Sequence, residues 1–276
     1  MSGMKKANRG LINGVLLVFS ISAVFPIIWM IYSSFKTQQE FALNILSWPS
    51  SVNFDNYRAA FEIGNLHHNF LNSVYVSLIS VTLIIFLGFI AAYMIARFSF
   101  PGRKTIYILF LFGMLVPIHG LLIPVFIHYR NLSLLDQWYT LILPYVAFGL
   151  PIAIFLFESF IRGIPKEIEE AAIVDGCTTF QIIFRIIFPI SMPIVATATI
   201  LSFLTAWNEF PFALVLIQSE ALRTMPVGLT SFNGQYSVNY PQMMSAMVIT
   251  TLPVLMLYLA FYKKIIKGMT AGAVKG

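Results

Sequence analysis

The stretch FLNSVYVSLISVTLIIFLGFIAAYMIA, residues 70–96, contains no charged side chain. An α-helix rises about 1.5 Å per residue, so roughly 20 apolar residues cross the hydrocarbon core of a bilayer. This stretch is long enough to cross a membrane as one helix. The composition of the chain agrees, because 58% of its 276 residues are hydrophobic, 10% are charged and the mean hydropathy is +0.83. Soluble domains contain about 25% charged residues, so an ordinary soluble enzyme is excluded.

Five other stretches have a similar length and composition. The predicted spans are Leu11–Phe35, Phe70–Ala96, Thr105–Ile127, Trp138–Phe157, Pro189–Ile217 and Gln242–Ile265. Lys5, Lys6 and Arg9 precede the first span, as in a signal peptide, but its apolar run is longer than an h-region and no A-x-A site ends it. We therefore expect a retained helix. The predicted fold is an all-α polytopic membrane protein with six transmembrane helices.

The basic residues lie mainly on one side of these spans. Thirteen of the 17 Lys and Arg residues lie in the N-terminal segment, the connectors 97–104 and 158–188, and the C-terminal tail. The other four lie in the connectors 36–69, 128–137 and 218–241. Because cytoplasmic loops are enriched in Lys and Arg, both termini are predicted to be cytoplasmic. The net charge of +6 thus reflects membrane topology, and nucleic-acid binding is not expected.

The inner connector IPKEIEEAAIVDGCTTFQIIFRIIFP, residues 164–189, predicts two short helices joined at a glycine. Its EIEE run places negative charge near the positive N-terminal end of the first helix. Ile168, Ala171 and Ala172 follow the i, i+3, i+4 rule and predict one small apolar face. Gly176 stands where a helix is expected to end.

The second helix of the connector is predicted to start at Thr178, with Gln181 as its capping-box partner. Pro189 is expected to end this helix before the fifth span. Spacing alone leaves two readings open. The connector is either an amphipathic hairpin on the bilayer surface or a docking element whose small residues allow a partner to approach closely.

The same connector resembles the EAA signature of ABC-importer permeases, EAA-x3-G-x9-I-x-L-P. The matching residues are Glu170, Ala171, Ala172, Gly176, Ile186 and Pro189. Phe188 replaces the usual Leu and retains an apolar side chain. The segments SFLTAWNEFPFALVLI and GMTAGAVKG are similar to the MalG-type carbohydrate-uptake branch, and the resemblance covers roughly residues 70–276.

This resemblance implies the type I ABC importer permease fold, in which the EAA loop forms coupling helices that sit in a cleft of an ATPase subunit. The residues then expected to couple to the ATPase are Glu170, Ala171, Ala172, Asp175, Gly176, Ile186 and Pro189. The implied partners are a homologous second permease subunit, two cytoplasmic ATPase subunits and an extracytoplasmic sugar-binding protein, all at a bacterial cytoplasmic membrane, with lipid around the spans.

Motifs for catalysis or cofactor binding are absent from the sequence. No G-x-x-x-x-G-K-[ST] loop occurs, so ATP and Mg²⁺ are expected in the ATPase subunits, with no cofactor in this chain. No H-E-x-x-H or G-x-S-x-G motif occurs and Cys177 is the single cysteine. We therefore expect no catalytic residue and no metal site.

Four residues are candidates for the substrate path: Trp207, Asn208, Glu209 and His119. An ionisable residue in a span is costly and usually faces the bundle interior or water. Trp207 would offer a stacking face to a pyranose, and Asn208 and Glu209 would hydrogen-bond its hydroxyl groups. A structural reading stays open, in which Glu209 pairs with a neighbouring helix and the prolines around His119 only kink the third span.

The predicted organisation has three parts. Residues 1–69 form the N-terminal tail, the first transmembrane helix and an outer loop; 70–265 form the transmembrane domain with the coupling loop 164–189; and 266–276 form a cytoplasmic tail. The predicted function is that of a permease subunit in an ATP-driven bacterial sugar or oligosaccharide importer. The alternatives are the same architecture importing another solute, such as glycerol phosphate or a modified glycan, and a self-sufficient channel or ion-coupled carrier.

Overall fold

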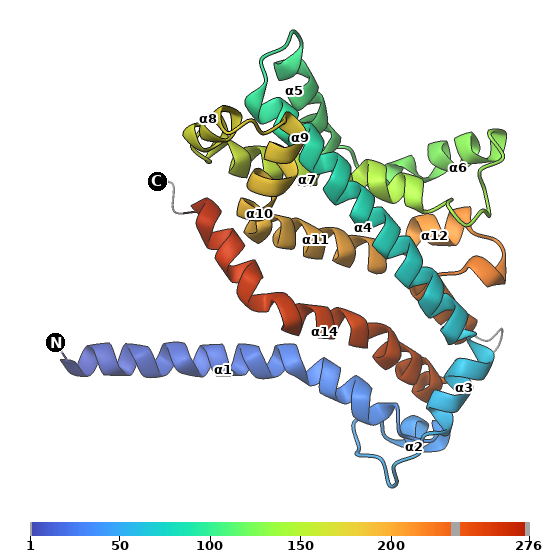
Figure 1. The fold of residues 1–276 in the computed structure, drawn as a ribbon. Helices are drawn as coiled ribbons and strands as arrows, with labels where there is room; N and C mark the ends of the chain where they lie inside the picture. The colour runs from blue at the N-terminus through green and yellow to red at the C-terminus, as the bar shows by residue number, and fades with distance from the viewer. Residues whose placement is uncertain (1, 233–237, 274–276) are drawn as a thin grey trace. The chain divides into compact units, whose positions relative to one another are not determined.

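The computed structural model describes residues 2–232 and 238–273, and its secondary-structure elements in these ranges are all helical (Figure 1). Four helices in the described chain are long and apolar enough to cross a membrane: Ile12–Ser33, Leu66–Arg97, Ile142–Arg162 and Tyr240–Phe261. Two bent helix pairs bring the number of spans to six if each pair counts as one. The prediction of an all-α polytopic membrane protein is confirmed.

The chain divides into two compact units, the first made of Met1–His67 and Gly228–Leu252. Its elements are α1 (Ser2–Ser33), α2 (Gln38–Leu43), α3 (Asp55–Ile63), η4 (Leu229–Phe232) and the first part of α14 (Tyr240–Ala273). Most of α1 within Ile12–Ser33 is apolar and not buried within this chain, whereas Tyr32 and Ser33 at its end are buried. Helix α14 continues to Ala273, so residues 266–273 of the predicted tail are helical, and 274–276 lie outside the described residues.

The loop after α1 is held in shape by polar contacts of Lys36 and Glu40. Lys36 is fully buried, and its Nζ donates hydrogen bonds to the carbonyl oxygens of Asn44 (3.1 Å) and Ile45 (2.8 Å). At the start of α2, Glu40 accepts hydrogen bonds from Ser50 and from the backbone N–H of Thr37. These hydrogen bonds, with that from the Ser50 side chain the strongest cause, lower the pKa of Glu40 to about 2. The segment is therefore a structured cap rather than a flexible linker.

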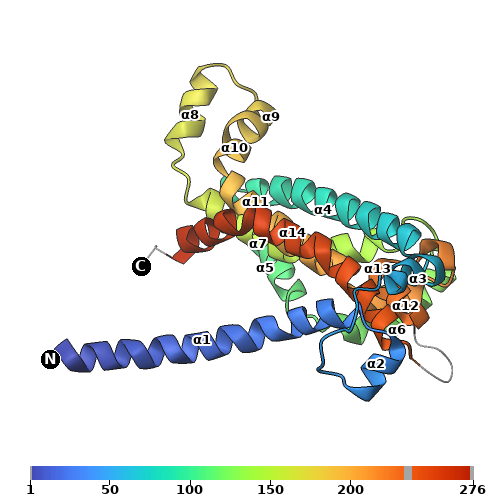
Figure 2. The ribbon, with the colours of Figure 1, turned by 90° about the horizontal axis from the view of Figure 1, so that it is seen from below.

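The second unit, His68–Val227 with Pro253–Gly276, contains the helical bundle. Its elements are α4 (Leu66–Arg97), α5 (Arg103–Gly113), η1 (Ile118–Leu121), α6 (Leu122–Asn131), α7 (Ile142–Arg162), α8 (Glu167–Val174), α9 (Thr179–Gln181), η2 (Ile182–Ile187), α10 (Phe188–Ile190), α11 (Met192–Trp207), α12 (Pro211–Leu216), η3 (Glu220–Leu222) and α13 (Met225–Gly228). Helix α7 packs against α5 and α11. In Figure 2, α8 and α9 stand away from this bundle as a hairpin.

Close packing between α4 and α7 fixes the centre of this unit. The ring of Phe89 meets Phe157 edge-on at 5.4 Å between centroids, and both side chains are fully buried. A Cβ built at Gly88 would lie 3.2 Å from the Ala153 side chain, so the helices approach closely there. Small residues allow this approach in membrane helices, where packing rather than hydrophobic exclusion drives association.

Two of the predicted spans are wrong as continuous helices. In Thr105–Ile127 the chain bends by 90° between α5 and the η1–α6 segment, and Pro117 is the N-cap of η1. Proline disfavours a helical conformation in the residue before it, so the break falls there. In Pro189–Ile217 the chain bends by 80° at Ser191, and α11 ends at Trp207 before Pro211 starts α12.

The prediction that Pro189 ends the second helix of the inner connector is also wrong. The helix passes through the π-helical turn η2 and ends at Ile190, beyond the proline. In the π turn the N–H of Phe188 donates to the carbonyl of Ile183, five residues back. This wider turn changes the hydrogen-bond register just before the residue that has no N–H to donate, so the helix accommodates the proline.

Candidate functional site

The α8–α9 hairpin has well-defined ends. Gly176 has φ +80°, its N–H donates to Ile173 O at 3.0 Å, and the N–H of Cys177 donates to Ala172 O at 2.9 Å. This pair of bonds is a Schellman motif, whose left-handed residue is usually glycine. The predicted stop at Gly176 is confirmed, one residue after the C-cap Asp175.

The start of α9 is also as predicted. The side chain of Thr178 accepts a hydrogen bond from the N–H of Gln181, and Gln181 Oε1 accepts from the N–H of Thr178 at 2.8 Å. This reciprocal capping box satisfies two backbone donors that the first turn leaves free. Neighbouring residues on both sides of Gly176 thus determine where α8 ends and where α9 begins.

Helix α8 is held to the bundle by two side chains, those of Glu169 and Ala172, which are its buried residues. The predicted small apolar face is therefore divided, because Ile168 and Ala171 are exposed while Ala172 joins the core. The buried pair is spaced i, i+3, so it lies on one side of the helix. That side carries a carboxylate, which the apolar pattern did not mark.

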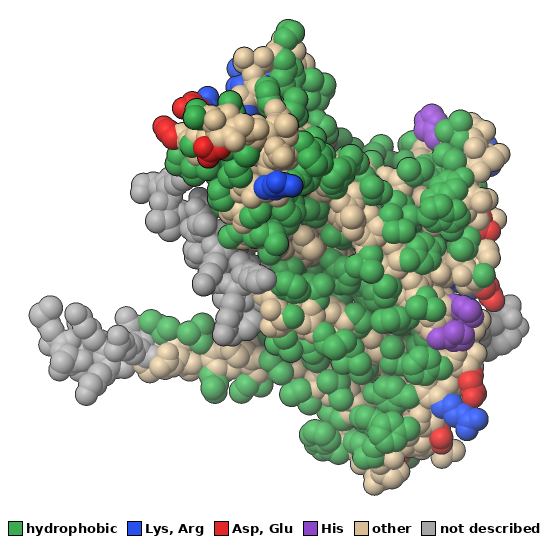
Figure 3. Space-filling view, in the orientation of Figure 1, with side chains coloured by type: hydrophobic (Ala, Val, Ile, Leu, Met, Phe, Trp, Pro, Cys, Tyr) green, Lys and Arg blue, Asp and Glu red, His purple; other side chains and the backbone are tan. Residues whose placement is uncertain are grey.

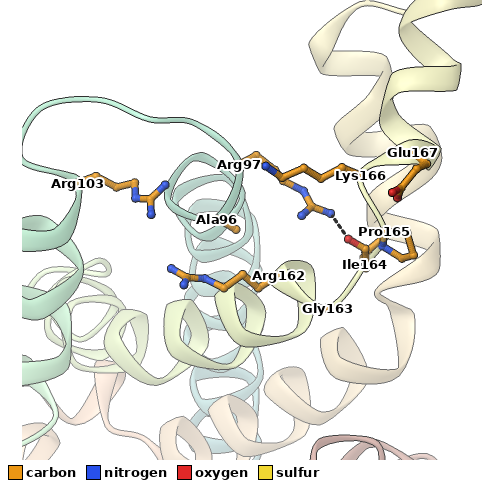
Figure 4. Close-up of a pocket in the computed structure, with 9 residues that line it drawn as sticks. All are labelled: Ala96, Arg97, Arg103, Arg162, Gly163, Ile164, Pro165, Lys166 and Glu167. Atoms are coloured by element: carbon orange, nitrogen blue, oxygen red, sulfur yellow. Dashed lines mark hydrogen bonds between the residues drawn. The ribbon is translucent and has the colours of Figure 1, made fainter. Parts of the chain in front are cut away.

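A buried ion pair fixes this carboxylate. Glu169 accepts hydrogen bonds from the hydroxyl of Tyr93 (2.7 Å) and from Nε of Arg97, whose side chain is only 6% exposed. Nη2 of Arg97 donates to the carbonyl of Ile164 at 2.8 Å (Figure 4). Arg97, the last residue of α4, therefore binds both the end of the α7–α8 link and α8 itself. No sequence motif marks this contact; a lone Arg at the end of one span and a Glu in the next inner connector were the available signals.

The outer face of the hairpin is exposed and largely apolar. The exposed fraction is 62% for Ile173, 86% for Val174 and 66% for Phe180. Glu170 and Ala171 are also exposed. We call the five residues the hairpin tip. Figure 3 shows carboxylates beside apolar surface over this region. Of the other residues expected to couple, Asp175 and Pro189 are exposed, and Ile186 is half-buried against the core.

A cavity of about 510 Å³ lies inside the second unit. Its wall includes His119 from η1, Asn208 after α11 and Glu209 before α12. The structure thus brings together three of the four residues predicted for the substrate path. Further polar groups come from Ser202 and Thr205 of α11. None of the residues that line this cavity in the described chain is Lys or Arg.

The carboxylate of Glu209 accepts three hydrogen bonds from other residues of this chain. It accepts hydrogen bonds from the Tyr145 hydroxyl (2.6 Å), from the N–H of Phe212 (2.7 Å) and from the N–H of Ala213 (3.0 Å). Two of these donors are free N–H groups in the first turn of α12, which a carboxylate satisfies well. Glu209 therefore fixes the α12 start against α7.

Trp207 does not line the cavity. Its side chain is 1% exposed, and its ring stacks on Phe203 (5.4 Å) and meets Phe70 edge-on (5.8 Å). The predicted stacking face for a sugar is wrong for this conformation, because both α11 and α4 cover the indole. The exposed side chain is that of Asn208, whose Nδ2 donates to Leu204 O at 2.9 Å.

Residues 84–270 match the family model described as "Binding-protein-dependent transport system inner membrane component". This chain belongs to that family. The sulfoquinovosyl glycerol transport system permease protein SmoH of Agrobacterium fabrum is 36% identical, over 94% of this chain and 91% of its own. The trehalose transport system permease protein SugB of Mycobacterium tuberculosis is 36% identical, over 92% and 93%.

The fold of this permease is shared with a solved structure. A chain in the crystal structure of a bacterial ABC transporter involved in the import of the acidic polysaccharide alginate has a TM-score of 0.81 and 23% identity, over 94% of this permease and 97% of that chain. The predicted ABC-importer permease fold and location in the inner membrane are confirmed. The permease belongs to a transport family, not to a family of enzymes.

Within the described residues, no three His, Cys, Asp or Glu side chains are grouped so that they could hold a metal ion. Cys177 of this permease is half-buried beside the Gly176 turn and forms no disulfide. The described residues offer three features: the exposed hairpin tip, the ion pair of Arg97 and Glu169, which we call the hairpin base, and a cavity with a few polar groups among apolar ones.

Proposed function

We propose that this permease forms half of the path for a sugar or oligosaccharide in an ATP-driven importer, and that the α8–α9 hairpin couples it to an ATPase subunit. The observation that carries the proposal is the hairpin itself, with an exposed apolar tip on a base held by a buried ion pair. Exposed apolar patches of this kind mark interaction surfaces. The relatives named for sulfoquinovosyl glycerol and trehalose transport support the substrate class.

The hairpin base would pass movement of the ATPase subunit to the spans. Arg97 joins Glu169 of α8 and the carbonyl of Ile164 to the end of α4. Helices α4 and α7 both contribute to the cavity wall, through Ile84 and Tyr145 among others. A displacement of α8 therefore reaches the cavity along two helices, instead of being lost by bending at the link between α7 and α8.

The other components of the proposed importer are inferred from the family. ATP and Mg²⁺ would be bound by two ATPase subunits in the cytoplasm, the side to which the distribution of basic residues assigns the hairpin connector and both termini. A second permease subunit would complete the path, and an extracytoplasmic binding protein would deliver the solute. The family description itself names a binding-protein-dependent system.

The cavity favours a neutral sugar. Pockets for small ligands measure roughly 300–1,000 Å³ and combine apolar walls with a few polar groups, and the cavity of about 510 Å³ fits this description. An ionised carboxylate has about four acceptor positions, and Glu209 uses three of them within the chain. Asn208 and Thr205 are therefore better placed than Glu209 to meet hydroxyl groups.

An acidic solute is the second candidate, because one relative is named for sulfoquinovosyl glycerol and one solved transporter for alginate. A sulfonate or carboxylate requires a cation or several oriented donors. His119 is the one cavity residue in the described chain that can gain a positive charge. Competition between neutral and acidic sugars for the binding protein, measured by calorimetry, would distinguish the two classes.

The coupling proposal is tested by adding a charge to the hairpin tip. The permease is co-expressed with candidate ATPase, second permease and binding-protein genes, and the purified complex is reconstituted in liposomes. Val174→Glu is expected to abolish ATP-driven uptake and to release the ATPase during purification, since the new carboxylate would be buried in the contact. The matched control is Val52→Glu, at a valine in the loop after α1 that is 67% exposed.

Two results would contradict the proposal. One is that Val174→Glu retains both the ATPase and normal uptake while the wild-type complex is active. The other is uptake by the permease alone, without ATP or partners, which would favour a channel or an ion-coupled carrier.

A further inference from the structure

A second cavity, of about 570 Å³, lies at one end of the bundle beside the hairpin base (Figure 4). Four basic residues from four segments line it: Arg97 at the end of α4, Arg103 at the start of α5, Arg162 at the end of α7 and Lys166 before α8. Glu167 is its one acidic lining residue in the described chain. We call this cavity the basic cleft.

The charges in the basic cleft are only partly balanced by carboxylates. Arg97 is paired with Glu169, and Arg162 with Glu158, whose side chain is 4% exposed. Arg103 donates to a backbone carbonyl, that of Phe98, at 3.2 Å. In Figure 4 the guanidinium groups of Arg103 and Arg162 point toward the same space.

The net result is one excess positive charge at the lining. After the two ion pairs are counted, Arg103 and Lys166 face the single carboxylate of Glu167. Converging like charges repel unless an anion lies between them. Guanidinium groups bind phosphate oxygens through two parallel hydrogen bonds, and phosphate is the anion that their geometry matches. A phosphodiester, with a single negative charge, would neutralise the excess.

The position of the cleft selects the source of that phosphate. Candidate spans end at Arg97 and at Arg162, and the bent pair that begins with α5 starts at Arg103. Because three membrane-crossing segments end at the cleft, it lies at the level where lipid headgroups meet the hydrocarbon core. Basic pockets between helices at this level suit anionic lipid headgroups.

Helix α5 offers the second half of a lipid site. It begins at Arg103 in the cleft, and it has no buried residue. Its residues Ile106, Leu109 and Phe112 are 41%, 63% and 59% exposed. They are spaced three apart, so they lie along one side of the helix leading from the cleft into the membrane. This strip suits acyl chains of a lipid whose headgroup occupies the cleft.

We propose that the basic cleft binds the phosphate of an anionic phospholipid, with its acyl chains along α5. The inference goes beyond the transport function and requires only that the permease spans a membrane. The occupant would brace the ends of α4, α5 and α7 next to the hairpin base. Free phosphate shares the headgroup chemistry but lacks the acyl chains that the exposed α5 residues would contact.

Photo-crosslinking of the complete transporter in nanodiscs tests this site. The discs contain phosphatidylcholine and a small fraction of phosphatidylglycerol with a photoreactive acyl chain, and labelled peptides are mapped by mass spectrometry. Label is expected on α5. Arg103→Gln and Lys166→Gln are each expected to lower it about ten-fold, since each removes a charged donor to the phosphate, and one hydrogen bond to a charged group contributes roughly that factor. Lys104→Gln is the matched control, because Lys104 is exposed and does not line the cleft.

Each other outcome would overturn the proposal. Equal labelling of all three variants would show that no cleft residue selects the lipid. Equal labelling by a photoreactive phosphatidylcholine would remove the requirement for an anionic headgroup. Loss of label with millimolar glycerol phosphate would indicate a site for free phosphate. Label on the isolated permease but not on the complete transporter would show that an ATPase subunit covers the cleft. The Val174→Glu result is read separately, so failure of either proposal leaves the other standing.

Discussion

Two carboxylates in this permease, the buried Glu169 and the half-buried Glu209, have similar partners and different roles. Glu169 at the hairpin base and Glu209 at the central cavity each accept a hydrogen bond from a tyrosine hydroxyl, Tyr93 at 2.7 Å and Tyr145 at 2.6 Å. The remaining donors differ. Glu169 is also bound by the guanidinium of Arg97, and its charge is neutralised there.

Glu209 has no such cation among its described partners, which besides Tyr145 are two backbone N–H groups of α12. Its negative charge is stabilised by the positive end of a short helix and by the cavity beside it. An ion pair holds two separate elements together, whereas a capping carboxylate fixes the start of the helix that follows it. The two sites are therefore expected to respond differently to loss of charge.

The largest effect is expected from Arg97→Met. It leaves Glu169 buried without its cation, and breaking a buried pair in this way costs about 3–5 kcal/mol. We expect a marked loss of thermal stability of the purified transporter, and ATP hydrolysis that no longer drives uptake in the molecules that remain folded. Thermal unfolding and the ratio of solute imported to ATP hydrolysed provide the two measurements.

The double variant Arg97→Met with Glu169→Leu is the control for this prediction. Removal of both charges leaves no unpaired charge, so most of the lost stability is expected to return. The Tyr93 hydroxyl and the Ile164 carbonyl still lose these partners, so recovery is expected to be incomplete. The coupling ratio should stay low if the ion pair transmits movement. If stability and coupling both recover, the pair has no role in coupling, and packing of α8 alone is sufficient.

A smaller effect is expected from Glu209→Gln. An amide offers one acceptor oxygen where the carboxylate offered two, so at least one backbone N–H of α12 loses its partner, at a cost of about 1–3 kcal/mol. Stability should fall while the solute concentration for half-maximal uptake stays unchanged. Asn208→Ala is the matched variant, for which the half-maximal concentration is expected to rise with little loss of stability. The opposite pattern would show that Glu209 binds the solute and Asn208 does not.

The difference between the two glutamates also shows what could be read from sequence. Glu209 was noticed because a carboxylate in an apolar span is rare, but its hydrogen bonds depend on where α11 ends and α12 begins. The predicted continuous span hid that break. Glu169 was one of three glutamates in a polar connector, and only the approach of α4, more than 70 residues away in the chain, makes it different from its neighbours.

Features set by neighbouring residues were predicted correctly. The stop at Gly176 and the capping box of Thr178 depend on a few consecutive residues, and both are present. The long apolar spans were recognisable because a bilayer demands length and low charge. The burial of Trp207 and the path of the helix through Pro189 were mispredicted, because packing against other helices decides the first and a π turn allows the second.

The smallest effect is expected at the other end of α8, from Gly176→Ala. A Cβ at this position would have no neighbour within 4 Å, so the cost arises from the left-handed backbone at φ +80° alone. That conformation costs an alanine about 1–2 kcal/mol. Because the turn shapes the hairpin without tying it to α4, we expect a modest loss of ATPase retention and an unchanged ratio of import to hydrolysis in intact complexes.

Gly176→Asn is the matched variant, since asparagine tolerates the left-handed region better than alanine does. It should therefore retain more ATPase than Gly176→Ala in the same co-purification. If both variants instead lower the coupling ratio as far as Arg97→Met does, then the turn at Gly176 carries movement as directly as the ion pair. The distinction between an ion pair that transmits movement and a turn that only sets the shape of the hairpin would then be wrong.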